Sequence, residues 1–261
     1  MEGLIIAFLL NLILASQAHT YTHHQNNPLL RMKTGGSSSL KYPLPNCLSW
    51  RIAVETGNLH DWNNLVPWEC YDYIRQYLLG AQYNDECFMV ADTAKDYAQD
   101  IENPKDGKSI WIFDIHDTLL SNLPYYTLAD ASFGDIPYSN PKFNEWMTEG
   151  SAPPLSGILY LYKNLTSFGI KSVFLSNIDD KYREVISSNL KAAGYTTWEK
   201  LILKGTSDPS DVVHYKSAKR TELVNAGYRV LGNIGDQWSD LTGHHVGDRT
   251  FKVPNPMYCV A

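Results

Sequence analysis

The stretch from Ile110 to Thr118 constrains this chain more than any other part of its sequence. It opens with an unbroken apolar run, IWIF, and Asp114 follows that run directly. An uninterrupted apolar run of this length is typical of a strand that is buried on both faces, as in a parallel sheet. Asp114 then lies at the carboxyl end of the strand, where open α/β sheets bind their ligands. Taken alone, the stretch fits equally well an Asp114 that only caps the next turn.

Downstream of this strand, glycine repeatedly ends a helical pattern shortly before a short apolar run. This arrangement occurs at Gly169 before 173–176, at Gly194 before 201–203, and at Gly227 before 228–234. Glycine just past a helix end is the usual stop signal. Strands that alternate with helices predict βαβ units. The predicted fold is therefore α/β, with a parallel, Rossmann-like sheet whose last strand lies near 251–253.

The segments on either side of the first strand complete the predicted organisation. Apolar residues recur at helical spacing from 67 to about 100, which predicts two helices packed against a larger body. The connection from the strand to about 150 is rich in turn-forming residues, and we expect a small lid there. The expected segments are a signal peptide at 1–18, a flexible lead-in at 19–41, a helical N-terminal region at 42–105 and an α/β core at 106–261.

The N-terminal segment, MEGLIIAFLLNLILASQA, is apolar but too short to cross a bilayer comfortably. Ser16 and Ala18 are small and fit a signal-peptidase site after Ala18. We expect entry into the secretory pathway, with the extracellular space and the vacuole as open alternatives, and no membrane segment in the mature form. Asn164-Leu165-Thr166 is a glycosylation acceptor in a predicted helix, so its use depends on exposure of that face.

The mature chain keeps four cysteines: Cys47, Cys70, Cys87 and Cys259. A secretory chain can form disulfides. Four cysteines allow three complete pairings, among which the sequence does not choose. No C-x-x-C pair occurs, and this absence argues against a zinc or redox site.

The charge pattern bears on the partners of the protein. The formal net charge is −6, and no basic run occurs in the sequence. Both features argue against a nucleic-acid partner. The sequence leaves the oligomeric state open, with a homodimer as one alternative.

Polar side chains follow three of the predicted strands at the point where each strand ends. Asp114 follows the first strand, Ser176 and Asn177 follow the second, and Asp236 follows the fourth, with Asp240 shortly after it. Because the carboxyl ends of parallel strands meet at one edge of a sheet, we expect these side chains to converge. Carboxylate and hydroxyl oxygens suit a hard cation, so the sequence predicts a Mg²⁺ site.

Lys216, at the start of the helix before the fourth strand, is expected to join this edge. A carboxylate such as Asp114 can attack phosphorus to give an aspartyl-phosphate. Mg²⁺ and Lys216 would then offset the charge on the phosphoryl oxygens. Each residue also has a plain structural alternative, since Ser176 can cap a loop and Lys216 or Asp240 can face water. The order Asp-x-x-x-Thr, strand-Ser, Lys and Gly-Asp-x-x-x-Asp is more specific, and it resembles the haloacid dehalogenase superfamily.

Longer segments resemble the plant acid phosphatases and vegetative storage proteins of that superfamily. They are YPLPNCLSW at 42–50, VET at 54–56, FDIHDTLLSNLPYY at 113–126, GNIGDQWSDL at 232–241 and FKVPNPMY at 251–258. The resemblance therefore covers nearly the whole mature chain. It implies a haloacid dehalogenase-like fold and the hydrolysis of small phosphomonoesters.

Matched motif by motif, Asp114 resembles the nucleophile, which is also a ligand of Mg²⁺. Asp236 resembles the second carboxylate ligand of the metal, with Asp240 near it. Ser176 resembles the phosphate-binding hydroxyl, and Lys216 resembles the lysine of the third motif. Two neighbours complete the expected site, namely Asn177 as a phosphate ligand and Thr118 as the threonine of the first motif.

His116 departs from the pattern that this resemblance implies. Phosphatases of the superfamily have an Asp at this position, where it acts as general acid and base. The backbone carbonyl of His116 can still bind the metal, because any side chain leaves it in place. The next residue, Asp117, is expected to point elsewhere, which makes it a poor substitute.

Whether the imidazole of His116 can act as general acid and base decides between the possible functions. Its reference pKa of about 6.5 means that it is mostly protonated at acidic pH and can donate a proton to the leaving group. The ring is longer than an Asp side chain, however, and Mg²⁺ would repel its cation. We expect an acid phosphatase of reduced activity with Asp114 and His116 as catalytic residues. The alternatives are a storage glycoprotein with little or no catalysis and a phosphate- or metal-binding protein without turnover.

Overall fold

The computed structural model describes residues 46–59, 66–128, 133 and 140–258. The expected signal peptide, the lead-in at 19–41 and Cys259 lie outside the described residues. Of the two compact units into which the chain divides, Met1–Pro43 also lies outside them, and Leu44–Ala261 contains every element discussed below.

The described residues contain one sheet of five strands in the order β3-β2-β1-β4-β5, and every neighbouring pair is parallel. The strands are β1 (Ser109–Phe113), β2 (Lys171–Asp179), β3 (Lys200–Lys204), β4 (Arg229–Gly235) and β5 (Arg249–Lys252). This arrangement confirms the predicted α/β fold. It also puts the stretch that ends at Asp114 at the centre of the sheet.

Strand β1 is buried on both faces, as its apolar sequence predicts. Trp111 and Phe113 belong to the core on one face of the sheet, and Ile110 and Ile112 belong to the core on the other face. This division follows from the alternation of side chains along a strand. Gly232 of β4 lies opposite Trp111, and a Cβ there would meet the indole ring at 2.5 Å, so the bulkiest side chain of β1 needs a glycine beside it.

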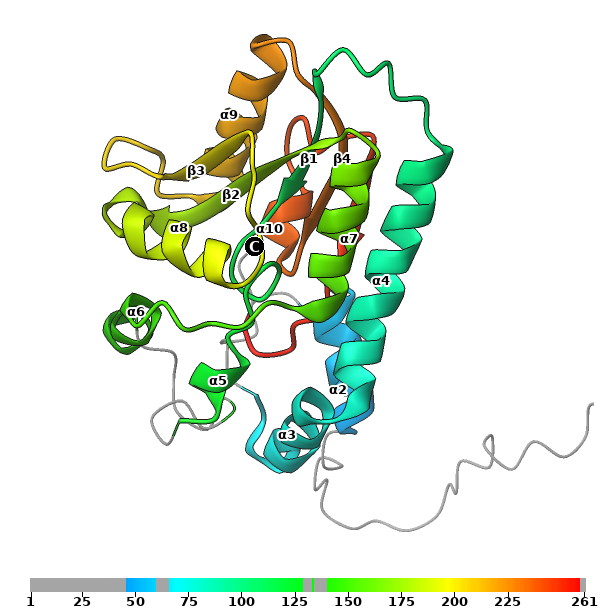
Figure 1. Ribbon diagram of the computed structural model, residues 1–261. Helices are drawn as coiled ribbons and strands as arrows, with labels where there is room; N and C mark the ends of the chain where they lie inside the picture. The colour runs from blue at the N-terminus through cyan, green and yellow to red at the C-terminus, as the bar shows by residue number, and fades with distance from the viewer. Residues whose placement is uncertain (1–45, 60–65, 129–132, 134–139, 259–261) are drawn as a thin grey trace, which may run out of the picture. The chain divides into compact units, whose positions relative to one another are not determined.

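Helices cover both faces of the sheet. On the face of Trp111, α4 (Ala81–Asp100) and α7 (Ser156–Ser167) pack side by side, as Figure 1 shows. The same core includes side chains of α3 (Tyr71–Leu79) and α8 (Arg183–Ala192). The opposite face is covered by α9 (Val212–Asn225) through Tyr215 and Leu223. Among the described residues, none of the helices combines the length and apolar character that a membrane span needs.

The N-terminal helices differ in one respect from the sequence-based expectation. A further helix, α2 (Cys47–Glu55), precedes the two helices expected from 67 to about 100, and Asn46 caps it by accepting a hydrogen bond from the Ser49 amide. A disulfide joins Cys47 to Cys70 at the end of η2 (Trp68–Cys70), which selects one pair among the cysteines. Cys87 is a buried free thiol.

The long connection after β1 contains two short helices rather than loop alone. They are α5 (Leu123–Tyr126) and α6 (Asn140–Thr148). Two more short elements follow strand ends, namely η4 (Asp180–Tyr182) after β2 and α10 (Trp238–Leu241) after β4. All four elements begin beyond the carboxyl ends of strands, where they can build the walls of a site.

Candidate active site

The chain after β1 folds back into a compact buried loop. The Leu120 amide donates a hydrogen bond to the Ile115 carbonyl at 2.8 Å, and the Asp117 amide donates one to the Leu120 carbonyl at 2.6 Å. Asp117 has a φ of 55°, a left-handed conformation that is rare for residues other than glycine. Such strained backbone is most often found at functional sites. The loop therefore holds Asp114 in a fixed position at the strand end.

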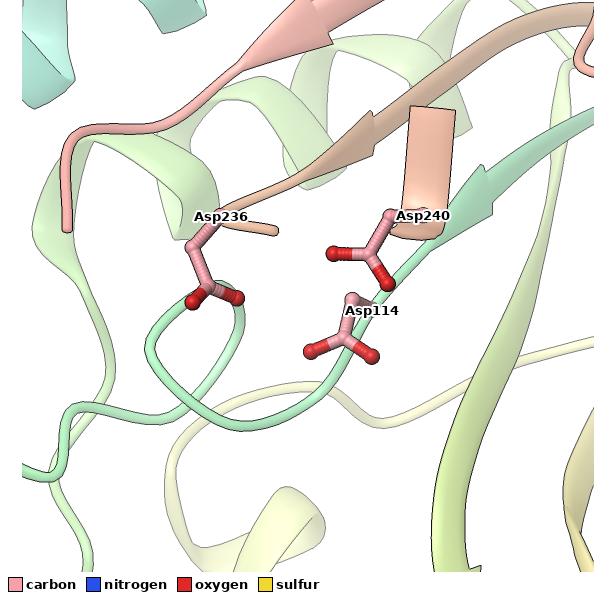
Figure 2. Close-up of side chains that lie close together, drawn as sticks. All are labelled: Asp114, Asp236 and Asp240. Atoms are coloured by element: carbon pink, nitrogen blue, oxygen red, sulfur yellow. The ribbon is translucent and has the colours of Figure 1, made fainter. Parts of the chain in front are cut away.

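Three buried carboxylates meet beyond the ends of β1 and β4. Figure 2 shows Asp114 directly after β1, Asp236 directly after β4 and Asp240 on α10, all turned toward one space. One ligand atom from each of them lies within 4.8 Å of the others. A Cβ at Gly235 would collide with the Asp240 side chain, so the glycine makes room for that carboxylate.

One half of this cluster, which we call the cationic half, consists of Asp114, Lys216 and Asp240. The Lys216 ammonium on α9 donates a hydrogen bond to Asp114 Oδ1 at 2.6 Å and another to Asp240 Oδ1. Burial disfavours the ammonium, yet the two carboxylates outweigh that effect and raise the pKa of Lys216. The other oxygen of Asp240 accepts the Gln237 amide at 3.0 Å. Both negative charges in this half therefore face a protein cation.

The other half, the amide half, is built around Asp236. Its carboxylate accepts hydrogen bonds from Thr118 Oγ1 at 3.1 Å, Gln237 Nε2 at 2.7 Å and Asn255 Nδ2 at 2.7 Å. Burial raises the pKa of Asp236, and the charge of Asp240 adds to the shift. In the part of the chain that the structure describes, no lysine or arginine forms an ion pair with Asp236. This half holds its negative charge with neutral donors alone.

Asp117 extends the amide half away from Asp114. It accepts hydrogen bonds from Tyr126 Oη at 2.5 Å, from the amide and side chain of Asn122 at 2.9 and 2.8 Å, and from Asn255 Nδ2 at 3.3 Å. Burial, together with the charge of Asp236, raises the pKa of Asp117 to about 7. Both carboxyl oxygens of Asp117 are therefore occupied by hydrogen bonds from these donors.

His116 faces the same cavity as Asp114. Its ring packs edge-on against Phe143 of α6, with centroids 5.4 Å apart, and its Nδ1 has no hydrogen-bond partner in the described residues. Burial lowers the pKa of His116 to about 4, and the charge of Lys216 contributes. The imidazole is therefore neutral at mildly acidic pH, whereas its reference pKa suggested a cation.

A cavity of about 410 Å³ lies above the carboxylates. Among the residues expected from the sequence, it is lined by Asp114, His116, Ser176, Asn177, Lys216 and Asp240. Tyr215 anchors the end of β2 by donating to the Ser176 carbonyl at 3.1 Å. The strand ends therefore bring these residues together, with Asp236 beside them through its contact to Thr118.

The structure also identifies residues that the sequence reasoning missed. Asn122, Tyr126, Gln237 and Asn255 hold the carboxylates of Asp117 and Asp236. Asn255 had a usable signal, because it follows the last predicted strand and must lie near the same sheet edge. The other three lie in loops or short helices, where periodicity gives no indication.

Asn164, the expected glycosylation acceptor, lies on α7 and takes no part in this cluster. Its side chain is half-buried and donates to the Tyr160 carbonyl at 2.8 Å within the helix.

The donor set fits a divalent cation in the amide half. Carboxylate oxygens are the ligands that Mg²⁺ prefers, and three of them converge here. Asp240 already faces Lys216, whereas Asp236 faces neutral donors alone. A cation between Asp114 and Asp236 would supply the missing positive charge, as buried carboxylates require.

Comparisons with known proteins agree with this geometry. The family model described as HAD superfamily, subfamily IIIB (acid phosphatase), matches residues 31–261. The chain is 42% identical to acid phosphatase 1 of Solanum lycopersicum over 82% of its own length and 83% of the relative's. It is 41% identical to the stem 28 kDa glycoprotein of Glycine max over 98% of each chain. It is also 41% identical to vegetative storage protein 1 of Arabidopsis thaliana over 85% and 81% of the two chains.

A solved structure shares the fold. The class C acid phosphatase from Bacillus anthracis superposes with a TM-score of 0.59 at 20% identity, over 73% of this chain and 85% of that one. The family match covers most of the chain, and the relatives are plant proteins. The chain therefore belongs to the acid phosphatases of subfamily IIIB of the HAD superfamily.

Proposed function

We propose that this protein hydrolyses small phosphomonoesters by way of an aspartyl-phosphate on Asp114. The observation that carries the proposal is the pair formed by Asp114 and Lys216 at the base of the cavity, with Nζ 2.6 Å from Oδ1. Lys216 in that place opposes the burial that raises the pKa of Asp114, and it offers positive charge to a phosphoryl group beside it.

The residues that line the cavity can carry both steps. Ser176, Asn177 and Lys216 bind the phosphoryl oxygens, while an oxygen of Asp114 attacks phosphorus and the ester P–O bond breaks. The departing oxygen takes up a proton to leave as an alcohol. Water then attacks the phosphorus of the aspartyl-phosphate and gives up a proton, which releases phosphate and restores Asp114. His116 lines the cavity and is neutral at mildly acidic pH, so its imidazole can take the proton that the water gives up, while the departing oxygen takes its proton from solvent.

Asp114, Asp236 and the backbone carbonyl of His116 would hold Mg²⁺. Asp240 is a poorer ligand because Lys216 and the Gln237 amide occupy its oxygens. When bound, the metal would neutralise charge on the phosphoryl oxygens. The chain's own part is to orient Asp236 toward that position through Thr118, Gln237 and Asn255.

His116 weakens the activity in this proposal. General acid–base help contributes about 10²–10⁴-fold when the group is well positioned. The imidazole is longer than an Asp side chain, it packs against Phe143, and no described residue orients its Nδ1. For these reasons His116→Asp should raise kcat by at least about tenfold, a small part of the acid–base contribution.

The test is the hydrolysis of p-nitrophenyl phosphate with and without Mg²⁺ by the parent, Asp114→Asn and His116→Asp. We expect weak Mg²⁺-dependent turnover in the parent, none in Asp114→Asn and a gain in His116→Asp. A fast parent with no gain from His116→Asp would make His116 a competent acid–base. Turnover that survives Asp114→Asn would refute the mechanism.

A second function, storage with little catalysis, draws support from the same His116 and from the relatives named as storage or stem glycoproteins. It predicts that the parent and His116→Asp both fail to turn over substrate with Mg²⁺ bound. The same assay therefore separates the two functions.

The proposal includes passage through the secretory pathway, with cleavage after Ala18 and glycosylation at Asn164. The Cys47–Cys70 disulfide supports it, because such bonds persist in oxidising compartments. Intact-mass measurement of the native protein tests both modifications. A mass equal to that of the unprocessed chain would contradict them.

A further inference from the structure

We propose that Asn255 is a positioning residue that orients Asp236 for Mg²⁺, an inference that rests on the metal site proposed above. Asn255 lies on the C-terminal segment after β5, 6% exposed, and it does not line the cavity. It therefore acts through Asp236 rather than on the substrate.

The contacts of Asn255 use its whole side-chain amide. Nδ2 donates to Asp236 Oδ2 at 2.7 Å and to Asp117 Oδ2 at 3.3 Å, while Oδ1 accepts the Met257 amide at 2.9 Å. An amide held at both ends has one orientation. Asn255 thereby helps to orient Asp236 through Oδ2, which also accepts Gln237 Nε2, while Thr118 donates to Oδ1.

The geometry around Asn255 explains why an amide is required. Asp117 and Asp236 are both buried, and one oxygen of each lies within hydrogen-bond distance of Asn255 Nδ2. An amide nitrogen with two hydrogens can donate to both carboxylates at once. An apolar side chain of similar shape would leave Asp236 held by Thr118 and Gln237 alone, and so less firmly oriented toward the metal position.

The backbone brings Asn255 to this position. Strand β5 pairs with β4 so that Lys252 lies opposite Gly235, and the Val253 amide donates to the Gly235 carbonyl at 2.9 Å. Pro254 and Pro256 flank Asn255 and restrict the φ angles on both sides. The segment therefore delivers the amide to the residue that follows Gly235, which is Asp236.

The test is calorimetric titration of the metal-free protein with MgCl₂. Partners that orient metal ligands typically contribute about 10–100-fold in metal affinity. We expect Asn255→Leu to weaken Mg²⁺ binding by at least about tenfold. Asn255→Ser, which keeps a short donor, should fall between Asn255→Leu and the parent and serves if the leucine variant does not fold.

The matched control is Asn189→Leu. Asn189 is equally buried, at 6% exposed, and its side chain bonds only the backbone of Ala152. We expect Asn189→Leu to lose stability in urea unfolding and to keep the parent's Mg²⁺ affinity. A general loss of structure would instead weaken binding in both variants.

Turnover of p-nitrophenyl phosphate supplies a second measurement. Asn255→Leu should need at least about tenfold more Mg²⁺ for half-maximal rate, while kcat at saturating Mg²⁺ recovers to within about threefold of the parent. Equal Mg²⁺ affinity in the parent and both Asn255 variants would overturn this inference and leave the phosphatase proposal standing. A parent that binds no Mg²⁺ would overturn the metal site and this inference with it.

Discussion

The two halves of the carboxylate cluster compensate negative charge in different ways. In the cationic half, the Lys216 ammonium contacts both Asp114 and Asp240. In the amide half, Asp236 and Asp117 share Asn255 and otherwise contact only neutral donors. All four carboxylates are buried, at 8% exposed or less, and the two halves differ in the charge of the partner.

This difference indicates which half is complete in the protein alone. A buried carboxylate paired with a cation is satisfied, whereas one held by amides and hydroxyls keeps an uncompensated charge. In the cationic half, each carboxylate contacts a cation that the protein itself supplies. In the proposed function, the amide half takes its cation, Mg²⁺, from solution.

The largest effect is expected from removing the cation, in Lys216→Met. Breaking a buried pair by deletion of one partner costs about 3–5 kcal/mol, because the other partner stays charged and buried. Loss of positive charge beside the phosphoryl group should also lower kcat by at least about 100-fold. Urea unfolding and p-nitrophenyl phosphate turnover measure the two effects.

The control for this change is Lys219→Met, one turn further along α9. Lys219 pairs with Asp208 and Glu222 outside the site. It should keep the parent's kcat and lose at most about 1 kcal/mol. Equal losses in Lys216→Met and Lys219→Met would show that the cationic half has no special role.

In the amide half, Asp236→Asn should separate metal binding from stability. Groups that only orient metal ligands contribute about 10–100-fold in metal affinity. Removal of a carboxylate ligand itself should therefore weaken Mg²⁺ binding by at least about 100-fold. The free energy of unfolding should change by less than about 1 kcal/mol, because the change also removes an uncompensated buried charge.

Calorimetry with MgCl₂ and urea unfolding measure both quantities for Asp236→Asn. Asp106→Asn is the control, since that carboxylate is exposed and pairs with Arg229 away from the cluster. A loss of several kcal/mol in Asp236→Asn would mean that the amide half is already balanced without metal.

The smallest effect is expected at an ion pair outside the site, Arg51 with Glu86. Burial opposes ionisation of Glu86, but hydrogen bonds from Arg51, Tyr77 and Gln82 outweigh it and lower its pKa. A lowered carboxyl pKa stabilises the fold above the unfolded pKa of about 4.3, and the contribution is lost as pH falls through the folded value. Glu86→Gln should cost about 1–2 kcal/mol at pH 7.

Urea unfolding across pH measures this smaller effect. The difference between the parent and Glu86→Gln should shrink below about pH 4, as the Glu86 carboxylate becomes protonated. Asp85→Asn on the exposed side of α4 is the matched control, with no expected change. A difference that stays constant down to pH 3 would contradict the assignment.

The sheet could be predicted because its signals are local. The apolar run before Asp114 and the glycines at 169, 194 and 227 each depend on a few neighbouring residues. Helix α2 lies within the helical N-terminal region expected at 42–105, although its start at the Asn46 cap was not predicted. The disulfide could not be chosen from sequence, since pairing depends on where two distant helices meet.

The carboxylate cluster could be expected from strand ends, but its division into two halves could not. Lys216 and Asp240 are brought together by α9 and α10, whose packing no spacing rule gives. The contact of Asn255 with Asp236 depends on the register of β5 beside β4. The neutral state of His116 follows from burial, which a reference pKa ignores.

The central claim is that Asp114 carries the phosphoryl group during turnover. The most direct measurement is acid quenching of the protein during hydrolysis of p-nitrophenyl phosphate, followed by peptide mass spectrometry. The account predicts a phosphoryl group on the peptide that contains Asp114, absent in Asp114→Asn and more abundant when hydrolysis of the intermediate is slowed. Turnover by the parent with no phosphorylated Asp114, or with the label on another residue, would contradict it.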